Sequence, residues 1–401
     1  MKMIKTALTA LIALAFVGIA SAQTTVRITG STAFRAATVT AIQNILNPGY
    51  TYGYIGSSVT GANQSTFVGT TKTGNLSVIV KCSWGGSVGG VQTIAQQSPV
   101  VTTALPYISE TNALTATGLV LTAATAALDS PANADIAMSD SFQSSTAFIG
   151  VGFNTLVDTV VGVVPFVWTK GRHSDDAVTA SLANVSNITP LLARAVLAGG
   201  APVSMFTGVE ADSTVYVYAM GRDEDSGTRL TAFADSGFGV FGNPLQYEAT
   251  VASGAITAVA PYRAQTVLGT PYTAGHSGYS SGGTLATTLN TPVATAARDA
   301  LNSKFALIAY FGVNDANGVN GGNNNLTYNG VAYSAENVRQ GRYTFWGFEH
   351  LMYRSTLAGN TKTVADQIAT QIRTTDAAVS GVLLSTMRVS RVTEGAVITR
   401  N

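Results

Sequence analysis

The stretch Thr214–Thr228, TVYVYAMGRDEDSGT, contains an apolar run that leads directly into a charged turn with a glycine. Thr214–Met220 predicts a strand, because aromatic and β-branched residues favour extended backbone. Arg222–Thr228 predicts the turn, and a helix is expected from Arg229 to Asp235. A strand, a glycine turn and a helix in succession are typical of α/β proteins.

The N-terminal part of the chain contains two further units of this kind. Thr24–Thr29 precedes the turn Gly30-Ser31-Thr32 and an expected helix over Ala33–Leu46. Leu76–Trp84 precedes a second glycine turn and an expected helix over Val91–Gln97. Other expected elements are strands at Ala134–Met138, Val160–Trp168 and Phe305–Val313, a helix at Leu191–Leu197 after Thr189-Pro190, and a helix at Val364–Arg373. Strands that alternate with helices indicate an α/β fold.

Residues 1–22 have the layout of a cleavable secretory signal. Lys2 and Lys5 precede the apolar run Ala7–Ile19, and Ala20-Ser21-Ala22 provides small residues at the expected cleavage site. The apolar run is shorter than the roughly 20 residues that span a bilayer, and no later stretch predicts a transmembrane helix. We therefore expect a periplasmic or extracellular protein that begins at Gln23.

The composition excludes several classes of partner. Charged residues make up only 11% of the chain, against about 25% in ordinary soluble domains. Without the signal the net charge is near zero, so no attraction to nucleic acid or anionic lipid is expected. Cys82 is the only cysteine and cannot form an intrachain disulfide. It is expected in the core, and its distance from the cleavage site argues against a lipid anchor.

The three glycine turns share a chemistry that suits an anion. Each places hydroxyl groups and unpaired backbone N–H groups at a helix N-terminus, where the helix dipole adds partial positive charge. Glycine allows close approach of the backbone, and Arg222 adds a planar set of donors suited to an oxyanion. An isolated turn of this kind usually only caps its helix, so the pattern alone leaves anion binding and capping both open.

Enzyme classes find little support in the chain. Gly278–Gly282 (GYSSG) fits the G-x-S-x-G pattern, but no apolar strand precedes it, as a nucleophilic serine at a strand-to-helix turn requires. His173, His276 and His350 have no metal-binding spacing. The glycine turns lack G-x-G-x-x-G and a Walker lysine, so no cofactor is expected and the chain is interpreted as a non-enzyme.

Three segments, in this order, resemble the phosphate-binding component of bacterial phosphate ABC importers. They are Gly86–Val91 (GSVGGV), Ala134–Asp140 (ADIAMSD) and Arg222–Thr228 (RDEDSGT). The family has Gly-Ser-Ser-Gly-Gly-Val, a strand that ends in Ser-Asp, and Arg-x-Asp-Gly-Ser-Gly-Thr. Weaker likeness extends to Thr189–Gly200, Phe305–Tyr310 and Asn337–Tyr353.

The resemblance implies the type II fold of periplasmic binding proteins, in which two α/β lobes close on a ligand in the cleft between them. Lobe 1 is expected to comprise 23–160 plus 345–401, and lobe 2 to comprise 161–344. A monomer that delivers phosphate, or a similar oxyanion, to an ABC permease is implied. The implied phosphate ligands are Ser31, Thr32, the Ala33 N–H group, Ser87, Arg222, Ser226, Gly227 and Thr228, with Asp140 beside them.

Asp140 has the most specific implied role. A carboxylate only accepts hydrogen bonds, so beside an anion it requires a ligand that still carries a proton. Phosphate carries one at neutral pH and sulfate does not. A sulfate oxygen facing Asp140 would leave buried acceptors unpaired, which is a basis for rejecting it.

The middle of the best motif departs from the family. Glu224 and Asp225 replace Asp-Gly, and Asp223 precedes them. Three carboxylates beside an anion oppose its binding unless they point away or pair with Arg222 and Arg229. Two alternatives therefore stay open: an exported structural or surface-matrix protein that keeps the fold without the ligand, and a binder of another oxyanion or a phosphorylated small molecule.

Overall fold

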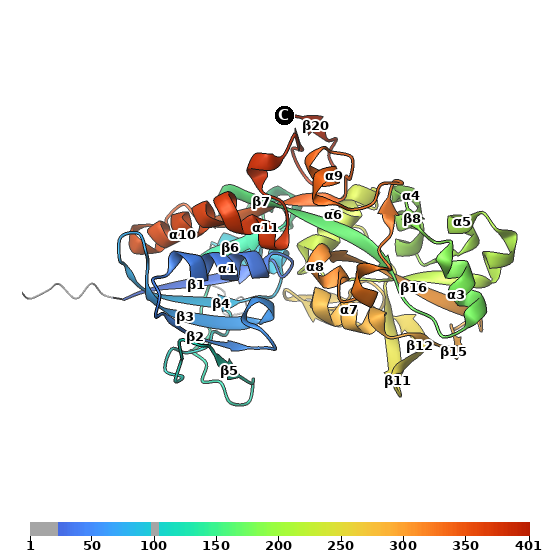
Figure 1. Cartoon of the computed structure of the whole chain (residues 1–401), viewed down its shortest axis with the longest axis horizontal. Helices are drawn as coiled ribbons and strands as arrows, with labels where there is room; N and C mark the ends of the chain where they lie inside the picture. Colours follow the sequence, from blue (N-terminus) through green and yellow to red (C-terminus); the bar gives the residue numbers. More distant parts are fainter. Residues whose placement is uncertain (1–22, 98–103) are drawn as a thin grey trace, which may run out of the picture.

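The structure is a computed structural model that describes residues 23–97 and 104–401. The expected signal peptide lies outside the described residues. Figure 1 shows two α/β lobes side by side, joined by long strands near the middle of the molecule. In the described ranges, no helix has the length and apolar character needed to cross a membrane.

One mixed sheet of eleven strands runs through both lobes. In spatial order its strands are β5 (Leu119–Leu121), β2 (Thr51–Ile55), β3 (Gln64–Thr70), β4 (Ser77–Ser83), β1 (Thr24–Gly30), β6 (Ile136–Ser139), β18 (Trp346–Arg354), β7 (Leu156–Lys170), β16 (Lys304–Gly312), β10 (Val215–Met220) and β9 (Ala201–Pro202).

The first lobe is built on the β5-to-β18 part of the sheet. β1 pairs in parallel with β4 and β6, with Ile28 opposite Cys82 and Ile136. β2, β3 and β4 are antiparallel neighbours. α1 (Arg35–Ile45) packs with α10 (Gly359–Gln371) and α11 (Ala377–Ser380), and α2 (Ser87–Ala95) packs on β1, β6 and β18.

The second lobe is built on β16, β10 and β9. β10 and β16 are parallel, and α6 (Gly227–Ser236) and α7 (Gly282–Asn290) pack on β16. The remaining helices of this lobe and of the C-terminal part are α3 (Asp176–Ala183), α4 (Pro190–Leu197), α5 (Ser204–Thr207), α8 (Val313–Ala316) and α9 (Ala335–Arg339). The remaining strands are β8 (Asn187–Ile188), β11 (Tyr247–Ala252), β12 (Ala255–Pro261), β13 (Gln265–Val267), β14 (Thr270–Tyr272), β15 (Val293–Arg298), β17 (Thr327–Tyr328), β19 (Val389–Ser390) and β20 (Thr399–Arg400).

β7 connects the lobes. It is 15 residues long, and its first part pairs with β18 while its last residues pair with β16. Because this one strand belongs to both parts of the sheet, residue 160 lies within a strand that the lobes share. The residue limits expected for the lobes stay a prediction.

The structure confirms the predicted α/β class and most of the predicted elements, with two differences in where helices begin. α2 begins at Ser87 rather than at Val91, so that Gly89 and Gly90 lie inside the helix. α6 begins at Gly227, directly after its capping residue Ser226. The segment 47–75, which lacks a helical period, contributes β2 and β3 to the main sheet.

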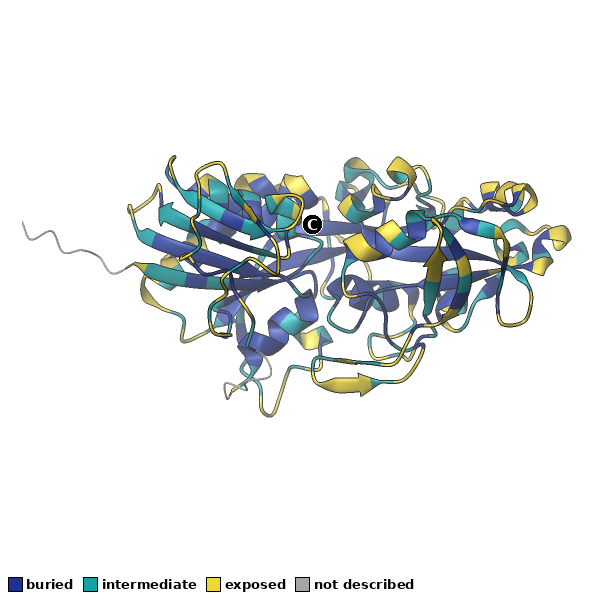
Figure 2. Cartoon of the chain, turned by 90° about the horizontal axis from the view of Figure 1, so that it is seen from below, coloured by how far each residue is buried: buried dark blue, intermediate teal, exposed yellow. Residues whose placement is uncertain are grey.

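The core follows the sheet from one lobe to the other, and Figure 2 shows its strands as a continuous buried layer. Trp168 on β7 and Tyr310 on β16 pack edge to face at 5.3 Å, which fixes the sheet where the lobes meet. Cys82 is free and fully buried on β4, and burial raises the pKa of its thiol to about 12. This matches the expected core role.

Candidate functional site

The predicted site segments meet between the lobes because each follows the carboxyl end of a strand. β1 ends at Gly30, β6 at Ser139 and β10 at Met220, while α2 follows β4. β1, β4 and β6 are parallel, so their carboxyl ends share one edge of the first lobe's part of the sheet. β10 and β16 run in the opposite direction, and the turn after β10 meets that edge from the second lobe. Ligands of open α/β sheets bind at the carboxyl ends of the strands. The chain therefore brings residues that lie far apart in sequence to one place.

Asp140 lies at the centre of this place and is bonded from both lobes. Its Oδ1 accepts a hydrogen bond from the Ser87 hydroxyl at 2.5 Å, and its Oδ2 accepts one from the Thr228 hydroxyl at 3.3 Å. Its side chain is almost fully buried, with 2% of the residue exposed. One carboxylate thus engages the first turn of α2 in the first lobe and the first turn of α6 in the second.

Gly227 makes this contact sterically feasible. A Cβ atom at this position would lie 1.7 Å from Oδ1 of Asp140 and 2.9 Å from Cβ of Ser87. No real side chain tolerates such distances, so any other residue would push the lobes apart. The glycine of the predicted Ser-Gly-Thr turn is therefore required by close approach across the cleft.

Arg222 is held by main-chain oxygens rather than by carboxylates. Its Nε donates to the Tyr279 carbonyl and its Nη2 to the Ser280 carbonyl, both at 2.9 Å. Its Nη1 lies 3.3 Å from Oγ1 of Thr32 in the other lobe. Its own N–H group donates to the Tyr310 hydroxyl at 3.2 Å. The guanidinium is buried, oriented and directed at the first lobe.

The three carboxylates of the acidic run have separate surroundings. Glu224 forms an ion pair with Arg229 at 3.0 Å and accepts a hydrogen bond from Ser277. Asp225 Oδ1 accepts the Gly89 N–H bond at 2.7 Å, and its carbonyl accepts the Val88 N–H bond. Asp223 is buried, with 6% exposed. The expected pairing with Arg229 is present for Glu224, whereas Arg222 has no carboxylate partner among the described residues.

The other predicted ligands lie in the same region in different roles. Ser31 donates its N–H group to the Met138 carbonyl, and its hydroxyl accepts the Phe34 N–H bond. Ser226 caps α6 by accepting the Arg229 N–H bond at 3.2 Å. Ala33 is half-buried close to Gly312. In the first turn, Thr32 is the residue whose hydroxyl contacts Arg222.

Sequence analysis missed three charged groups of the site. Glu349 on β18 is fully buried near Asp140 and Ser31. Arg35, at the start of α1, and Asp315, on α8, both lie close enough to Arg222 to interact with it electrostatically. No local pattern marks these residues, because they reach the site from separate strands and helices.

Burial dominates the electrostatics of the site. It raises the pKa of Asp140 to about 6, although the Ser87 hydrogen bond and the Arg222 charge oppose the shift. Burial also raises the pKa of Asp223 to about 7, and it raises the pKa of Glu349 well above its ordinary value, with the Asp140 charge adding to the effect. These carboxyl groups therefore release their protons at a higher pH than exposed carboxyl groups do.

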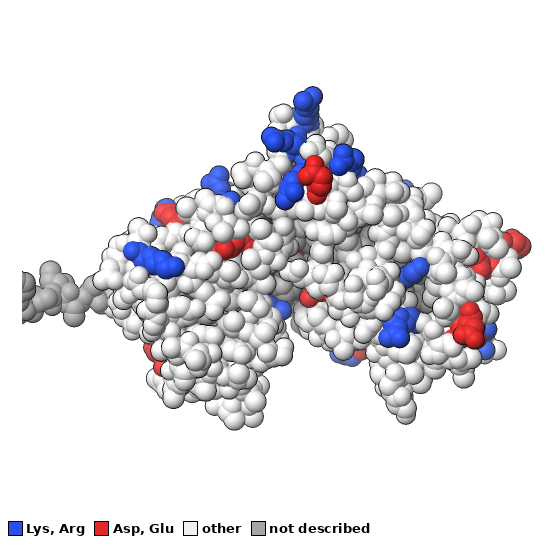
Figure 3. All heavy atoms as spheres, viewed as in Figure 1, with Lys and Arg blue, Asp and Glu red and all other residues white. Residues whose placement is uncertain are grey.

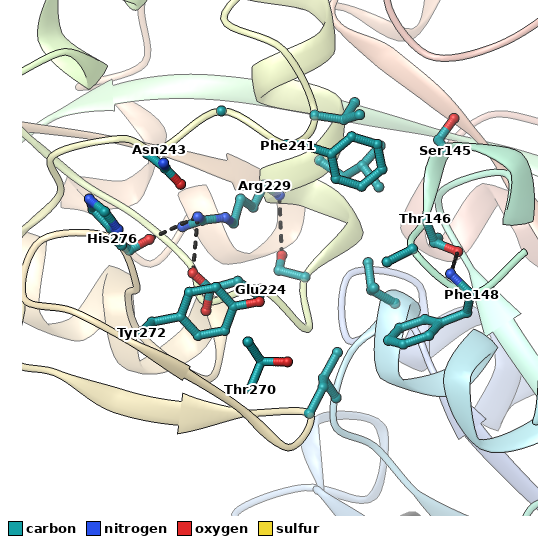
Figure 4. A pocket seen from close by; sticks show the side chains of 17 residues that line it. Ser145, Thr146, Phe148, Glu224, Arg229, Phe241, Asn243, Thr270, Tyr272 and His276 are labelled. Atoms are coloured by element: carbon teal, nitrogen blue, oxygen red, sulfur yellow. Dashed lines mark hydrogen bonds and ion pairs between the residues drawn. The ribbon is translucent and has the colours of Figure 1, made fainter.

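A pocket of about 210 Å³ adjoins these residues on the interlobe boundary. Figure 4 shows Phe148 of the first lobe opposite Phe241 and Tyr272 of the second, with Arg229 and Glu224 behind them. On the molecular face in Figure 3, charged side chains are sparse and the surface is notched between the lobes. Within residues 23–97 and 104–401, no group of three or more acidic, histidine or cysteine side chains is placed to hold a metal ion.

The G-x-S-x-G segment serves the arginine rather than a nucleophile. Tyr279 and Ser280 supply the carbonyls that hold Arg222, and Ser281 caps α7 by accepting the Thr284 N–H bond at 3.1 Å. The three histidine rings bond to residues elsewhere: Asp175, Thr273 and Asp158. In the described part of the chain this segment has no histidine partner of the kind a nucleophilic serine needs.

The chain matches several solved structures of known proteins. No protein-family profile and no curated protein matches the chain. A protein assigned as a phosphate ABC transporter substrate-binding protein from Clostridium perfringens, solved with bound phosphate, is 13% identical; the match covers 88% of this chain and 98% of that one, with a TM-score of 0.44. An ABC-type phosphate transport receptor from Vibrio cholerae is 11% identical, with coverage of 89% and 96% and a TM-score of 0.43. PstS from Borrelia burgdorferi is 12% identical, with coverage of 90% and 99% and a TM-score of 0.37.

Proposed function

We propose that this chain is an exported solute-binding protein that holds phosphate, or a closely similar tetrahedral oxyanion, between its lobes. The observation that supports this is the convergence of five predicted site residues at the boundary between the lobes, where the Arg222 charge also acts on Asp140. Thr32, Ser87 and Asp140 come from the first lobe, and Arg222 and Thr228 come from the second. We call these five residues the clamp.

The clamp supplies what a protonated oxyanion needs. Arg222 provides positive charge, and the hydroxyls of Thr32, Ser87 and Thr228 provide donors. The N-termini of α2 and α6 add N–H groups and partial positive charge. Asp140 accepts a hydrogen bond from the protonated oxygen of the ligand, and this selects phosphate over sulfate. We extend the proposal to a monomer that delivers its ligand to an ABC permease.

A specific observation favours a second candidate. Asp140 already occupies the Ser87 and Thr228 hydroxyls, and Asp225 already occupies two N–H groups at the start of α2. A protein whose own carboxylates satisfy the clamp could keep the fold without a ligand, as an exported structural protein. Ligand binding distinguishes the two candidates.

The test is the melting temperature of the protein without its first 22 residues, measured with phosphate and with sulfate. A ligand at 100 times its dissociation constant adds about 2.7 kcal/mol of stability. We expect a rise with phosphate and little change with sulfate. The absence of a shift at millimolar phosphate would favour the structural candidate.

Two variants on one helix make the test specific. Thr228→Val removes the clamp hydroxyl at nearly constant shape, and we expect it to weaken phosphate binding by about tenfold, the equivalent of one hydrogen bond to a charged group. Thr231→Val is the matched control, because Thr231 is also buried on α6 but its hydroxyl has no hydrogen-bond partner in the described part of the chain. Equal affinities of the two variants would contradict the clamp.

A further inference from the structure

The pocket in Figure 4 shares its inner wall with the clamp. Val88 lines the pocket, and its chain neighbour Ser87 belongs to the clamp. Ser226 lines the pocket as well, one residue before Gly227, which packs against Asp140. Successive Cα atoms lie 3.8 Å apart, so the pocket and the clamp residues are separated by about one residue.

The residues that separate the clamp from the pocket belong to both lobes, and we call the boundary between them the seam. Ser87 belongs to the first lobe, and Ser226 and Gly227 belong to the second. All three have minimal side chains. Since Asp140 is buried beneath this seam, any ligand reaches the clamp only when the lobes separate along it. A ligand that lies in both spaces would then have its narrow linking atoms at the seam when the lobes close.

The pocket itself has the character of a site for an apolar group. Phe148 faces it from the first lobe, and Phe241, Tyr272 and Leu230 face it from the second. Phe241 is 70% exposed, so most of its ring surface is free to contact a ligand in the pocket. The pocket is below the roughly 300 Å³ typical of drug-sized ligands, and its size suits a single ring or a short chain.

The charges beside the pocket are already compensated. Arg229 donates to the carbonyls of Arg222 and His276 and pairs with Glu224. Glu224 also accepts the Ser277 hydroxyl. Because this ion pair is complete without a ligand, the pocket offers no net charge for a second anionic group. We therefore expect the anionic group of the ligand to bind at the clamp and its apolar group to bind in the pocket.

From this arrangement we infer that the natural ligand class is a phosphomonoester of a small apolar or aromatic alcohol, rather than inorganic phosphate alone. The inference rests on the proposed oxyanion clamp and specifies its ligand. The phosphoryl group would bind to the clamp, with one of its oxygens protonated toward Asp140. The ester oxygen would cross the seam at Ser87 and Gly227, and the organic group would lie between Phe148 and Phe241.

The experiment compares inorganic phosphate, phenyl phosphate and phenol by calorimetric titration of the same protein. Burial of one aromatic ring is worth roughly ten- to hundredfold in affinity, so we expect phenyl phosphate to bind at least tenfold more tightly than phosphate. Phenol alone should bind far more weakly than phenyl phosphate.

Three variants locate the effect. Ala147→Trp fills the pocket from an exposed position, and we expect it to abolish the advantage of phenyl phosphate while leaving phosphate affinity unchanged. Phe241→Ala should reduce the advantage severalfold. Ala123→Trp, at an exposed alanine in the loop after β5, is the matched control and should change neither affinity.

The outcomes separate this inference from the proposed function. If phosphate binds and phenyl phosphate binds no more tightly, the inference is overturned and the phosphate proposal stands. If neither binds, the clamp itself fails. If phenol binds as tightly as phenyl phosphate, the pocket is a separate site, and the inference is again overturned.

Discussion

Asp140 is a buried carboxyl group whose charge changes close to neutral pH. Its pKa of about 6 in the folded protein lies above the value of roughly 3.9 expected in the unfolded chain. Below a pH of about 4, Asp140 is protonated in both the folded and the unfolded state, so folding does not bury a charged carboxylate. As the pH rises toward 6 the unfolded state releases its proton first, so stability falls across this window and stays reduced above it.

The corresponding variant is Asp140→Asn, which keeps the shape and removes the charge. The shift of about two pKa units corresponds to about 3 kcal/mol between pH 4 and pH 7. We expect the unliganded variant to lose less stability than wild type over this range by up to that amount, as measured by urea unfolding. Asp223 and Glu349 remain in both proteins, but removal of the Asp140 charge also removes part of the cause that raises the pKa of Glu349, so the measured difference contains both effects.

The same variant tests whether Asp140 recognises a protonated oxygen of the ligand. An asparagine amide can donate to a sulfate oxygen, which a carboxylate cannot do. Asp140→Asn should therefore narrow the difference between phosphate and sulfate affinities in the same titration. Unchanged discrimination would show that Asp140 acts only in closing the lobes.

At the scale of elements, the N-terminus of α2 is capped by the opposite lobe. The first N–H groups of a helix have no partner within it, and here Asp225 accepts two of them through Oδ1 and its carbonyl. A carboxylate at this position is favourable for the helix dipole. It also places negative charge next to the clamp, where an anionic ligand would experience repulsion.

Asp225→Ala should therefore have opposite effects on stability and on binding. Loss of a capping side chain costs about 1 kcal/mol, so we expect a lower free energy of unfolding. Phosphate affinity should rise, because a nearby negative charge is removed. Asp225→Asn keeps an acceptor oxygen and serves as the control, with affinity raised and stability better retained. Weaker phosphate binding in both variants would show that Asp225 supports the ligand rather than opposing it.

Elements with a local signature could be predicted from the sequence. Thr189 caps α4 and Pro190 occupies its first turn, as that dipeptide indicated. The apolar runs that became β10 and β16 were equally clear. α2 was expected to begin too late because Gly89 and Gly90 resemble turn residues, yet Gly90 approaches β1 so closely that a Cβ would lie 2.8 Å from Cα of Gly30.

The rest of the site depends on contacts between distant segments. Five predicted ligands converged because each lies beyond the carboxyl end of a strand, and the strand ends of the two lobes face one another. Glu349 lies on a strand whose pairing with β6 and β7 no short window encodes. The carbonyls that hold Arg222 belong to Tyr279 and Ser280, and carbonyl groups carry no residue-specific signal.

At the scale of the whole molecule, the lobes already touch without a ligand. Arg222 contacts Thr32, Thr228 contacts Asp140, and Gln92 of α2 donates to the Leu268 carbonyl at the tip of the β13–β14 hairpin. These bonds join the lobes in addition to the connecting strand β7. The molecule therefore has a closed form that its own side chains stabilise.

Such a molecule should change its overall dimensions little when ligand binds. We expect the radius of gyration from small-angle X-ray scattering to be the same with and without phosphate for the wild-type protein. Asp225→Ala, which removes one of the side-chain bonds between the lobes, should be more expanded without phosphate and should contract when phosphate is added. A clear contraction of the wild-type protein would show that the open form predominates without ligand.

The way in which Arg222 is held has a consequence for how such a site changes over time. A side-chain partner can be lost by a single substitution, but a main-chain carbonyl is present whatever residue occupies positions 279 and 280. Mutations there can accumulate without moving the guanidinium, provided that the loop keeps its course. A binding site can in this way keep its geometry while the residues that build it become unrecognisable.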